Sequence, residues 1–168
     1  MPDKGLDSLF YDTLRDMYYA ERHILTTLPQ LESAAVSDEL KAAFNKHHHE
    51  TQGQIARLEQ VFSLIDRKPV SKRCEAIDGI LKEGDGLLED YEGMTALDAG
   101  LISSAQAVEH YEITRYGTLR RWAKVLGLPD AVDLLGQSLE EESMTDELLT
   151  RIADAEANAR ASRVSKES

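Results

Sequence analysis

The stretch that decides the fold is LISSAQAVEHYEITRYGTLRRWAKVL, residues 101–126. Its inward positions recur every three or four residues, which is the spacing of one face of an α-helix, and they are 102, 105, 109, 112, 116 and 119. Glu109 and Glu112 interrupt this otherwise largely apolar stripe. A buried carboxylate without a partner is costly. The stretch therefore predicts a core helix that carries a polar site.

Three other stretches show the same helical periodicity, and no stretch alternates apolar and polar residues as a strand does. The four predicted helices cover about residues 6–35, 37–65, 95–126 and 129–157. Pro29 falls inside the first of them and predicts a kink or a break, because proline removes one backbone donor. The chain is therefore expected to be all-α.

Residues with capping preferences mark the ends of these helices. Ser37 predicts an N-cap for the second helix, and Thr95 with Asp98 predicts a variant capping box for the third. Gly127 is typical of a helix C-terminus, and Pro129 is typical of the first turn of the next helix.

The lengths of the connections predict the topology. Short turns join the first two helices and the last two, so each pair is expected to form an antiparallel hairpin. A long crossover at residues 67–94, interrupted by glycines and long enough for one or two short helices, joins the hairpins. This is the arrangement of a ferritin-like four-helix bundle. We expect the bundle to span residues 4–158, followed by a flexible tail at residues 159–168.

The composition excludes several classes of function. The chain has 168 residues with 31 Asp and Glu against 19 Lys and Arg, a formal net charge of −12. Such an acidic balance argues against a nucleic-acid binder and against an anionic membrane surface as partner. No apolar run is long enough to span a bilayer, and no secretory signal is visible. A single cysteine, Cys74, favours a reducing compartment, which predicts a cytoplasmic protein.

Every predicted helix carries at least one acid inside its inward stripe. The inward acids are Glu21, Glu50, Glu109, Glu112, Glu142 and Asp146. His47 and Gln54 share the stripe of the second helix, His47 as a possible ligand or neighbour of the site and Gln54 as a hydrogen-bond partner of a ligand. The acids lie at similar distances from the two hairpin turns, so they are expected to meet at mid-height of the bundle.

Clustered carboxylates repel one another unless cations neutralise them. An oxygen-rich set with at most one imidazole suits iron, manganese or magnesium better than zinc. Di-metal bundles hold two ions between four helices, which predicts two bound metal ions here. By the symmetry of the two hairpins, Glu50 and Glu142 would bridge the ions, and Glu21 and Glu109 would be terminal.

Several motifs along the chain then define a resemblance. They are LFYDTL at 9–14, YAE at 19–21, HETQGQI at 49–55, RLEQVF at 57–62, AVEHYE at 107–112, LEEE at 139–142 and TD at 145–146. Together these motifs resemble the YciE/YciF-like branch of the ferritin-like superfamily. The resemblance implies a homodimeric four-helix bundle with a di-metal centre, linked to stress responses. It implies Glu21, Glu50, Glu109 and Glu142 as ligands, with Glu112 and Asp146 as further ligands.

One departure from the wider ferritin-like pattern is visible. That pattern places histidines three residues after the glutamates of two helices, where this chain has Gly53 and Thr145. Three classes of function therefore stay open. The chain is a redox enzyme that uses iron or manganese with peroxide or O₂, a stress protein that sequesters metal without turnover, or a structural bundle. The structural alternative predicts strongly raised pKa values for the inward carboxyls.

Overall fold

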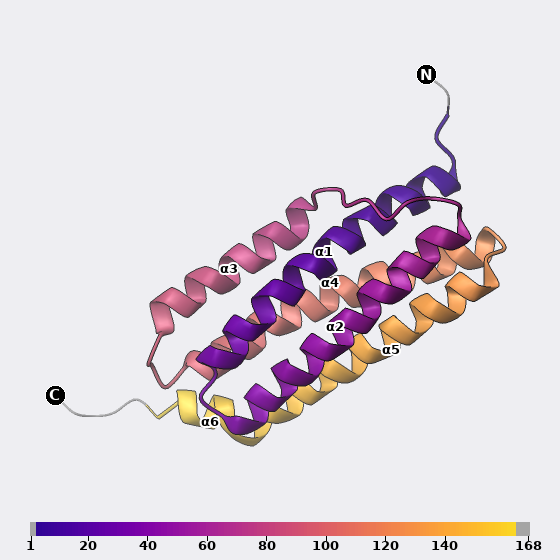
Figure 1. The fold of residues 1–168 in the computed structure, drawn as a ribbon. Helices are drawn as coiled ribbons and strands as arrows, with labels where there is room; N and C mark the ends of the chain where they lie inside the picture. The colour runs from indigo at the N-terminus through magenta and orange to yellow at the C-terminus, as the bar shows by residue number, and fades with distance from the viewer. Residues whose placement is uncertain (1–2, 164–168) are drawn as a thin grey trace.

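The structure, a computed structural model, describes residues 3–163, and every regular element in that range is a helix (Figure 1). The helices are α1 (Leu6–Ala34), α2 (Asp38–Leu64), α3 (Glu75–Tyr91), α4 (Leu97–Val125), α5 (Pro129–Ile152), a π-helix (Ala153–Ala157) and α6 (Asn158–Ala161). The predicted all-α fold is confirmed. None of the helices in residues 3–163 has the length and apolar character needed to cross a membrane.

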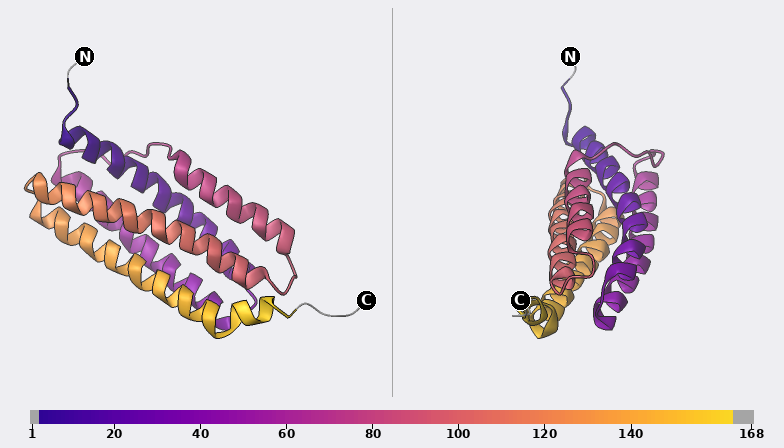
Figure 2. Two further views of the ribbon diagram at one scale, coloured as in Figure 1. Left: turned by 180° about the vertical axis from the view of Figure 1, so that it is seen from behind. Right: turned by 90° about the vertical axis from the view of Figure 1, so that its left-hand side faces the viewer.

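Four long helices form the bundle, and α3 lies outside it (Figure 2). α1 packs against α2 and α4, and α5 packs against α2 and α4. The long crossover contains α3, which covers the outer side of α4 and touches α1. The segment before α3 follows α1, where Lys72 N donates to Arg15 O at 3.2 Å. The predicted ferritin-like arrangement of two hairpins and one crossover is confirmed.

Local chemistry fixes several helix ends as expected. The Ser37 hydroxyl accepts a hydrogen bond from Leu40 N at 3.4 Å and caps α2. Gly127 has φ +71°, a left-handed conformation that ends α4 at little cost because glycine has no Cβ. Pro129 is the first residue of α5.

The predicted capping box of α4 is wrong. The N-cap of α4 is Ala96, which makes no side-chain cap. Asp98 instead lies buried and accepts hydrogen bonds from Val36 N at 2.8 Å and Ser37 N at 2.9 Å. A tertiary contact with the turn between α1 and α2 therefore replaces the local cap.

The structure decides two expectations about helix continuity that the sequence left open. α1 continues through Pro29 to Ala34, so the proline does not end the helix. α3 is one helix of 17 residues that includes its three glycines. At the C-terminus, α6 extends to Ala161, inside the segment expected to be a flexible tail, because Arg160 binds Asp98 and Glu156. The last part of that tail, residues 164–168, lies outside the described residues.

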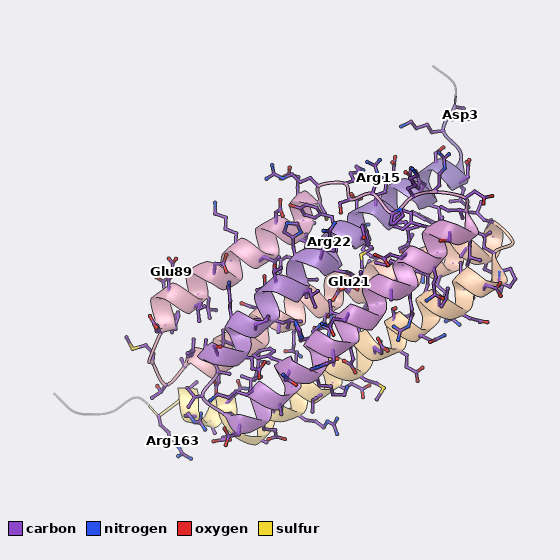
Figure 3. All side chains as sticks on the ribbon, in the orientation of Figure 1. Asp3, Arg15, Glu21, Arg22, Glu89 and Arg163 are labelled. Atoms are coloured by element: carbon purple, nitrogen blue, oxygen red, sulfur yellow. The ribbon has the colours of Figure 1, made fainter. Side chains whose placement is uncertain are left out.

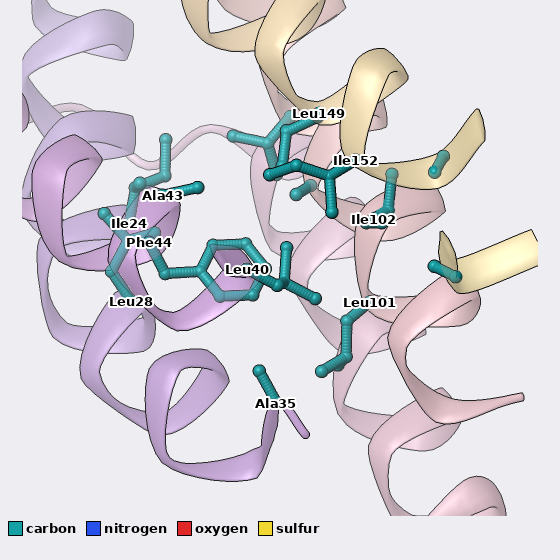
Figure 4. Close-up of a cluster of buried hydrophobic side chains, with 14 of the residues drawn as sticks. Ile24, Leu28, Ala35, Leu40, Ala43, Phe44, Leu101, Ile102, Leu149 and Ile152 are labelled. Atoms are coloured by element: carbon teal, nitrogen blue, oxygen red, sulfur yellow. The ribbon is translucent and has the colours of Figure 1, made fainter. Parts of the chain in front are cut away.

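Two apolar clusters fill the bundle on either side of its middle. One contains Phe44, Leu101 and Ile152 among its buried side chains (Figure 4). The other contains Phe10 and Phe62 and lies near the opposite end. Charged side chains such as Glu89 and Arg163 project from the outside (Figure 3). The buried apolar surface stabilises both ends and leaves the middle layer for polar groups.

Candidate metal centre

The middle layer of the bundle is a cluster of buried acids and one histidine. The exposed fraction is 0% for Glu21, Glu112 and Glu142, 1% for Glu109 and 3% for His47. The helical period brings these residues to the inner face of their helices, at the level that the sequence predicted. Three of the four long helices contribute a carboxylate with no exposed surface, and α2 contributes the imidazole.

Four of these side chains approach one another closely enough to share one cation. One ligand atom each from His47, Glu109, Glu112 and Glu142 can be chosen so that all four lie within 4.8 Å of one another. They come from α2, α4, α4 and α5. Carboxylate oxygens with one imidazole nitrogen form a donor set typical of iron and manganese sites.

His47 supplies the positive counterpart inside the cluster. Its Nε2 lies 3.0 Å from Glu109 Oε1 and 3.8 Å from Glu142 Oε2, although neither contact has the alignment of a hydrogen bond. Burial alone would lower the pKa of His47, but the neighbouring Glu109 carboxylate raises it well above its ordinary value. The surrounding carboxylates therefore favour the protonated form of the histidine, whose positive charge offsets part of theirs.

Glu21 is held by a tyrosine from α4. The fully buried Tyr116 hydroxyl donates a hydrogen bond to Glu21 Oε1. Burial raises the pKa of Glu21 to about 7, against the opposing effects of Glu112 and Tyr116. The hydrogen bond also fixes the orientation of the Glu21 carboxylate.

Glu112 and Glu142 bear the strongest electrostatic cost of the arrangement. Burial and then the neighbouring Glu142 raise the pKa of Glu112 well above its ordinary value. Burial and then Glu109 do the same to the pKa of Glu142. Without a cation, these carboxyls can bind one another only by sharing protons. Such shifts are the ones that a metal-free structural bundle predicts, so they do not decide between the open classes.

Six buried carboxylate oxygens of the cluster have no hydrogen-bond donor among the described residues. They are Glu21 Oε2, Glu109 Oε2, Glu112 Oε1 and Oε2, and Glu142 Oε1 and Oε2. Buried polar atoms in folded proteins are almost always satisfied, so a group of orphaned acceptors at one place needs an explanation. Cations would satisfy all six, and the donor set therefore fits a metal.

Glu50 lies at the margin of the cluster. Its side chain is 18% exposed, and Lys46 binds its Oε1. Its Oε2 accepts a hydrogen bond from the Thr145 hydroxyl at 3.2 Å and lies 3.7 Å from His47 Nδ1. Burial raises the pKa of Glu50, but the nearby His47 and the Lys46 ammonium outweigh this effect and bring the pKa to about 2. Glu50 is therefore ionised.

The structure does not bring Asp146 together with the other five acids. Its Oδ1 accepts a hydrogen bond from Gln106 Nε2 at 3.1 Å, and its Oδ2 lies 3.1 Å from His110 Nε2. His110 is 69% exposed, so this group lies on the outer side of α4 and α5. Asp146 follows Glu142 by about one turn of α5, but its side chain lies at the edge of the inward face and contacts α4 instead of the cluster.

A polar network next to the cluster was not found from the sequence. Gln54 Nε2 donates to Glu141 Oε2 at 3.1 Å, and Arg57 donates to both oxygens of Glu141. Arg57 also donates to the Ser138 hydroxyl at 3.0 Å. Gln54 was expected to hydrogen-bond a ligand, but its donor is used by Glu141. No local pattern signals a pair such as Arg57 and Glu141, because only the packing of α2 on α5 brings them together.

Fold and site together define a ferritin-like four-helix bundle with a buried cluster of carboxylates around one imidazole. The chain belongs to the family described as "Domain of unknown function (DUF892)", which matches residues 5–162.

Relatives with known sequences or structures support this assignment. Protein YciF of Escherichia coli strain K12 is 38% identical over 159 residues, which cover 94% of this chain and 96% of YciF. The crystal structure of that protein, described as a stress protein, matches with a TM-score of 0.88 and covers 93% of this chain and 99% of its own. YcfI of Rhodopseudomonas palustris, described as a candidate structural protein, is 43% identical with a TM-score of 0.85, covering 88% and 94% of the two chains.

Proposed function

We propose that this chain is a stress-response protein that binds two ions of iron or manganese in its central cluster. The observation that carries the proposal is the set of six buried carboxylate oxygens without a donor. Leaving such groups uncompensated costs several kcal/mol, whereas bound cations would turn the same groups into a stabilising site. A role in stress is supported by the likeness to the E. coli stress protein YciF.

The ligands that we propose are Glu21, Glu50, Glu109, Glu112 and Glu142, together with His47. We leave Asp146 out of this set, because Gln106 and His110 already occupy its two oxygens. Tyr116 would orient Glu21, and the apolar clusters on both sides would keep bulk water from the site. Bound iron or manganese would supply redox chemistry toward peroxide or O₂.

The first experiment is metal analysis of protein purified without chelators after iron or manganese supplementation. We expect about two ions per chain, as in di-metal bundles. The matched control is the Glu50→Ala/Glu142→Ala variant, which should retain less than one ion per chain. Less than one ion per chain in the unchanged protein would contradict the proposal.

A second assay separates turnover from sequestration. Peroxide loss is followed with the metal-loaded protein and with the Glu50→Ala/Glu142→Ala variant at equal total metal. A faster loss with the unchanged protein would support an enzyme. Equal rates would leave metal sequestration as the function.

We also propose that the protein is a cytoplasmic homodimer. The compartment is supported by the single free thiol, Cys74. The homodimer rests on the resemblance to the YciE/YciF-like branch, and light scattering of the purified protein measures it directly.

A further inference from the structure

Among the five acids that we propose as ligands, only Glu50 reaches solvent. Its side chain is 18% exposed, whereas the other four are between 0% and 1% exposed. Glu50 is therefore the one acid of this set that a cation in solvent can contact directly. The position of Glu50 at the boundary makes it the natural starting point of an access route.

The two oxygens of Glu50 face different environments. Oε1 binds the ammonium of Lys46, whose side chain is 54% exposed. Oε2 faces inward, where Thr145 and His47 lie 3.2 Å and 3.7 Å away. Thr145 is itself almost completely buried, with 4% exposure. One carboxylate thus connects the solvent-facing ammonium to the inner cluster.

Neighbouring parts of the surface are closed by other contacts. α3 covers the outer side of α4 and touches α1. Further along the packed pair α2 and α5, Arg57 and Glu141 form an ion pair across the two helices. Next to Glu50, by contrast, the solvent-exposed partner is Lys46, which lies four residues earlier on the same helix.

We propose that the pair Lys46–Glu50 is the access port of the metal centre and that Lys46 is a positioning residue that controls metal uptake. This inference rests on the proposed function. An arriving divalent cation would compete with the Lys46 ammonium for Glu50 Oε1. The displaced ammonium would return to water, where its solvation is favourable, and exposed pairs of this kind are weak. Glu50 could then pass the ion toward the cluster.

The test measures how fast Mn²⁺ enters the metal-free full-length protein, by stopped-flow competition with a metal-sensitive dye. In Lys46→Gln, both the competing ammonium and its repulsion of the cation are gone. We expect the second-order uptake rate constant to rise about three- to tenfold at low salt. The difference should largely disappear in about 0.5 M salt, because screening weakens exposed charge interactions.

Lys41→Gln is the matched control. Lys41 lies on the same helix and forms no ion pair with the described acids. Lys41→Gln removes one positive charge from the chain, as Lys46→Gln does. We expect its uptake rate to stay within about twofold of the unchanged protein. Circular dichroism of both variants checks that the helices are intact.

The outcomes distinguish this inference from the function on which it rests. If the unchanged protein binds Mn²⁺ but Lys46→Gln and Lys41→Gln take it up at equal rates, the access port is wrong and the metal site stands. If the unchanged protein binds no Mn²⁺ at equilibrium, both proposals are wrong. Faster uptake in Lys46→Gln alone, with salt sensitivity, supports the port.

Discussion

The two hairpins of the bundle contribute unequally to its centre. The hairpin of α4 and α5 places Glu109, Glu112 and Glu142 in the core with at most 1% exposure. The hairpin of α1 and α2 contributes one fully buried acid, Glu21, and adds the imidazole of His47. Its second acid, Glu50, is partly exposed and already paired with Lys46.

This difference teaches how one bundle can hold excess negative charge. The second hairpin supplies most of the orphaned carboxylate oxygens, and the first supplies most of the compensation. The symmetry of the two hairpins therefore does not imply two equal half-sites. If the proposed function is correct, substitutions in the two hairpins should have unequal consequences.

The largest effect should come from removing a buried acid of the second hairpin. Glu142→Ala should weaken metal binding by about 100-fold or more, since it removes a central ligand and leaves its neighbours in place. Glu50→Ala should weaken it by only about tenfold, because Glu50 lies at the margin. Isothermal titration with Mn²⁺ measures both variants, and equal losses would mean that the two hairpins contribute alike.

A second prediction concerns pH and tests the buried acid of the first hairpin. The pKa of Glu21 is about 7 in the folded protein and 4.5 ordinarily, so the folded state retains a proton that the unfolded chain releases near pH 4.5. The resulting stabilisation is present at low pH and is lost as the pH rises to 7. For the metal-free protein we expect the titration of Glu21 to lower the free energy of unfolding by about 3 kcal/mol as the pH rises from about 4.5 to about 7.

Chemical denaturation with a chelator present, at several pH values, gives this measurement. The Glu21→Gln variant is the control, because an amide does not titrate. It should lose that part of the pH dependence while keeping the part due to other groups. A variant with the same slope as the unchanged protein would show that Glu21 keeps its ordinary pKa.

The smallest effect should follow from changing Asp146. Its partners are Gln106 and the largely exposed His110, and contacts of this kind contribute about 0–1 kcal/mol. Asp146→Asn should change the affinity for Mn²⁺ by less than about twofold. A loss comparable to that of Glu142→Ala would return Asp146 to the ligand set and increase the difference between the two hairpins.

Local sequence chemistry predicted most of the fold. Ser37, Gly127 and Pro129 act within one turn of their own position, so their effects are visible in the sequence. Asp98 was misread as a capping residue because its partners, Val36 and Ser37, lie 62 and 61 positions away. The sequence left open whether Pro29 kinks or ends its helix, and α1 continues through it because packing can outweigh one lost backbone hydrogen bond.

Most of the inward acids were also predictable from the sequence. Helical periodicity predicted that Glu21, Glu109, Glu112 and Glu142 point inward, and the structure buries all four side chains. It was less informative at the edges of a stripe, where the side chains of Glu50 and Asp146 are 18% and 21% exposed. The contact between Lys46 and Glu50 could not be predicted from the sequence, because the side chains of an i,i+4 pair on a helix can equally both be solvated.

The position of Asp98 also has a consequence for the order of folding. This buried carboxylate joins the start of α2, through Val36 and Ser37, to Arg160 in α6 at 3.3 Å. The contact can form only after residue 160 has left the ribosome. Until then Asp98 lacks its cationic partner, so a nascent chain would complete this end of the bundle last.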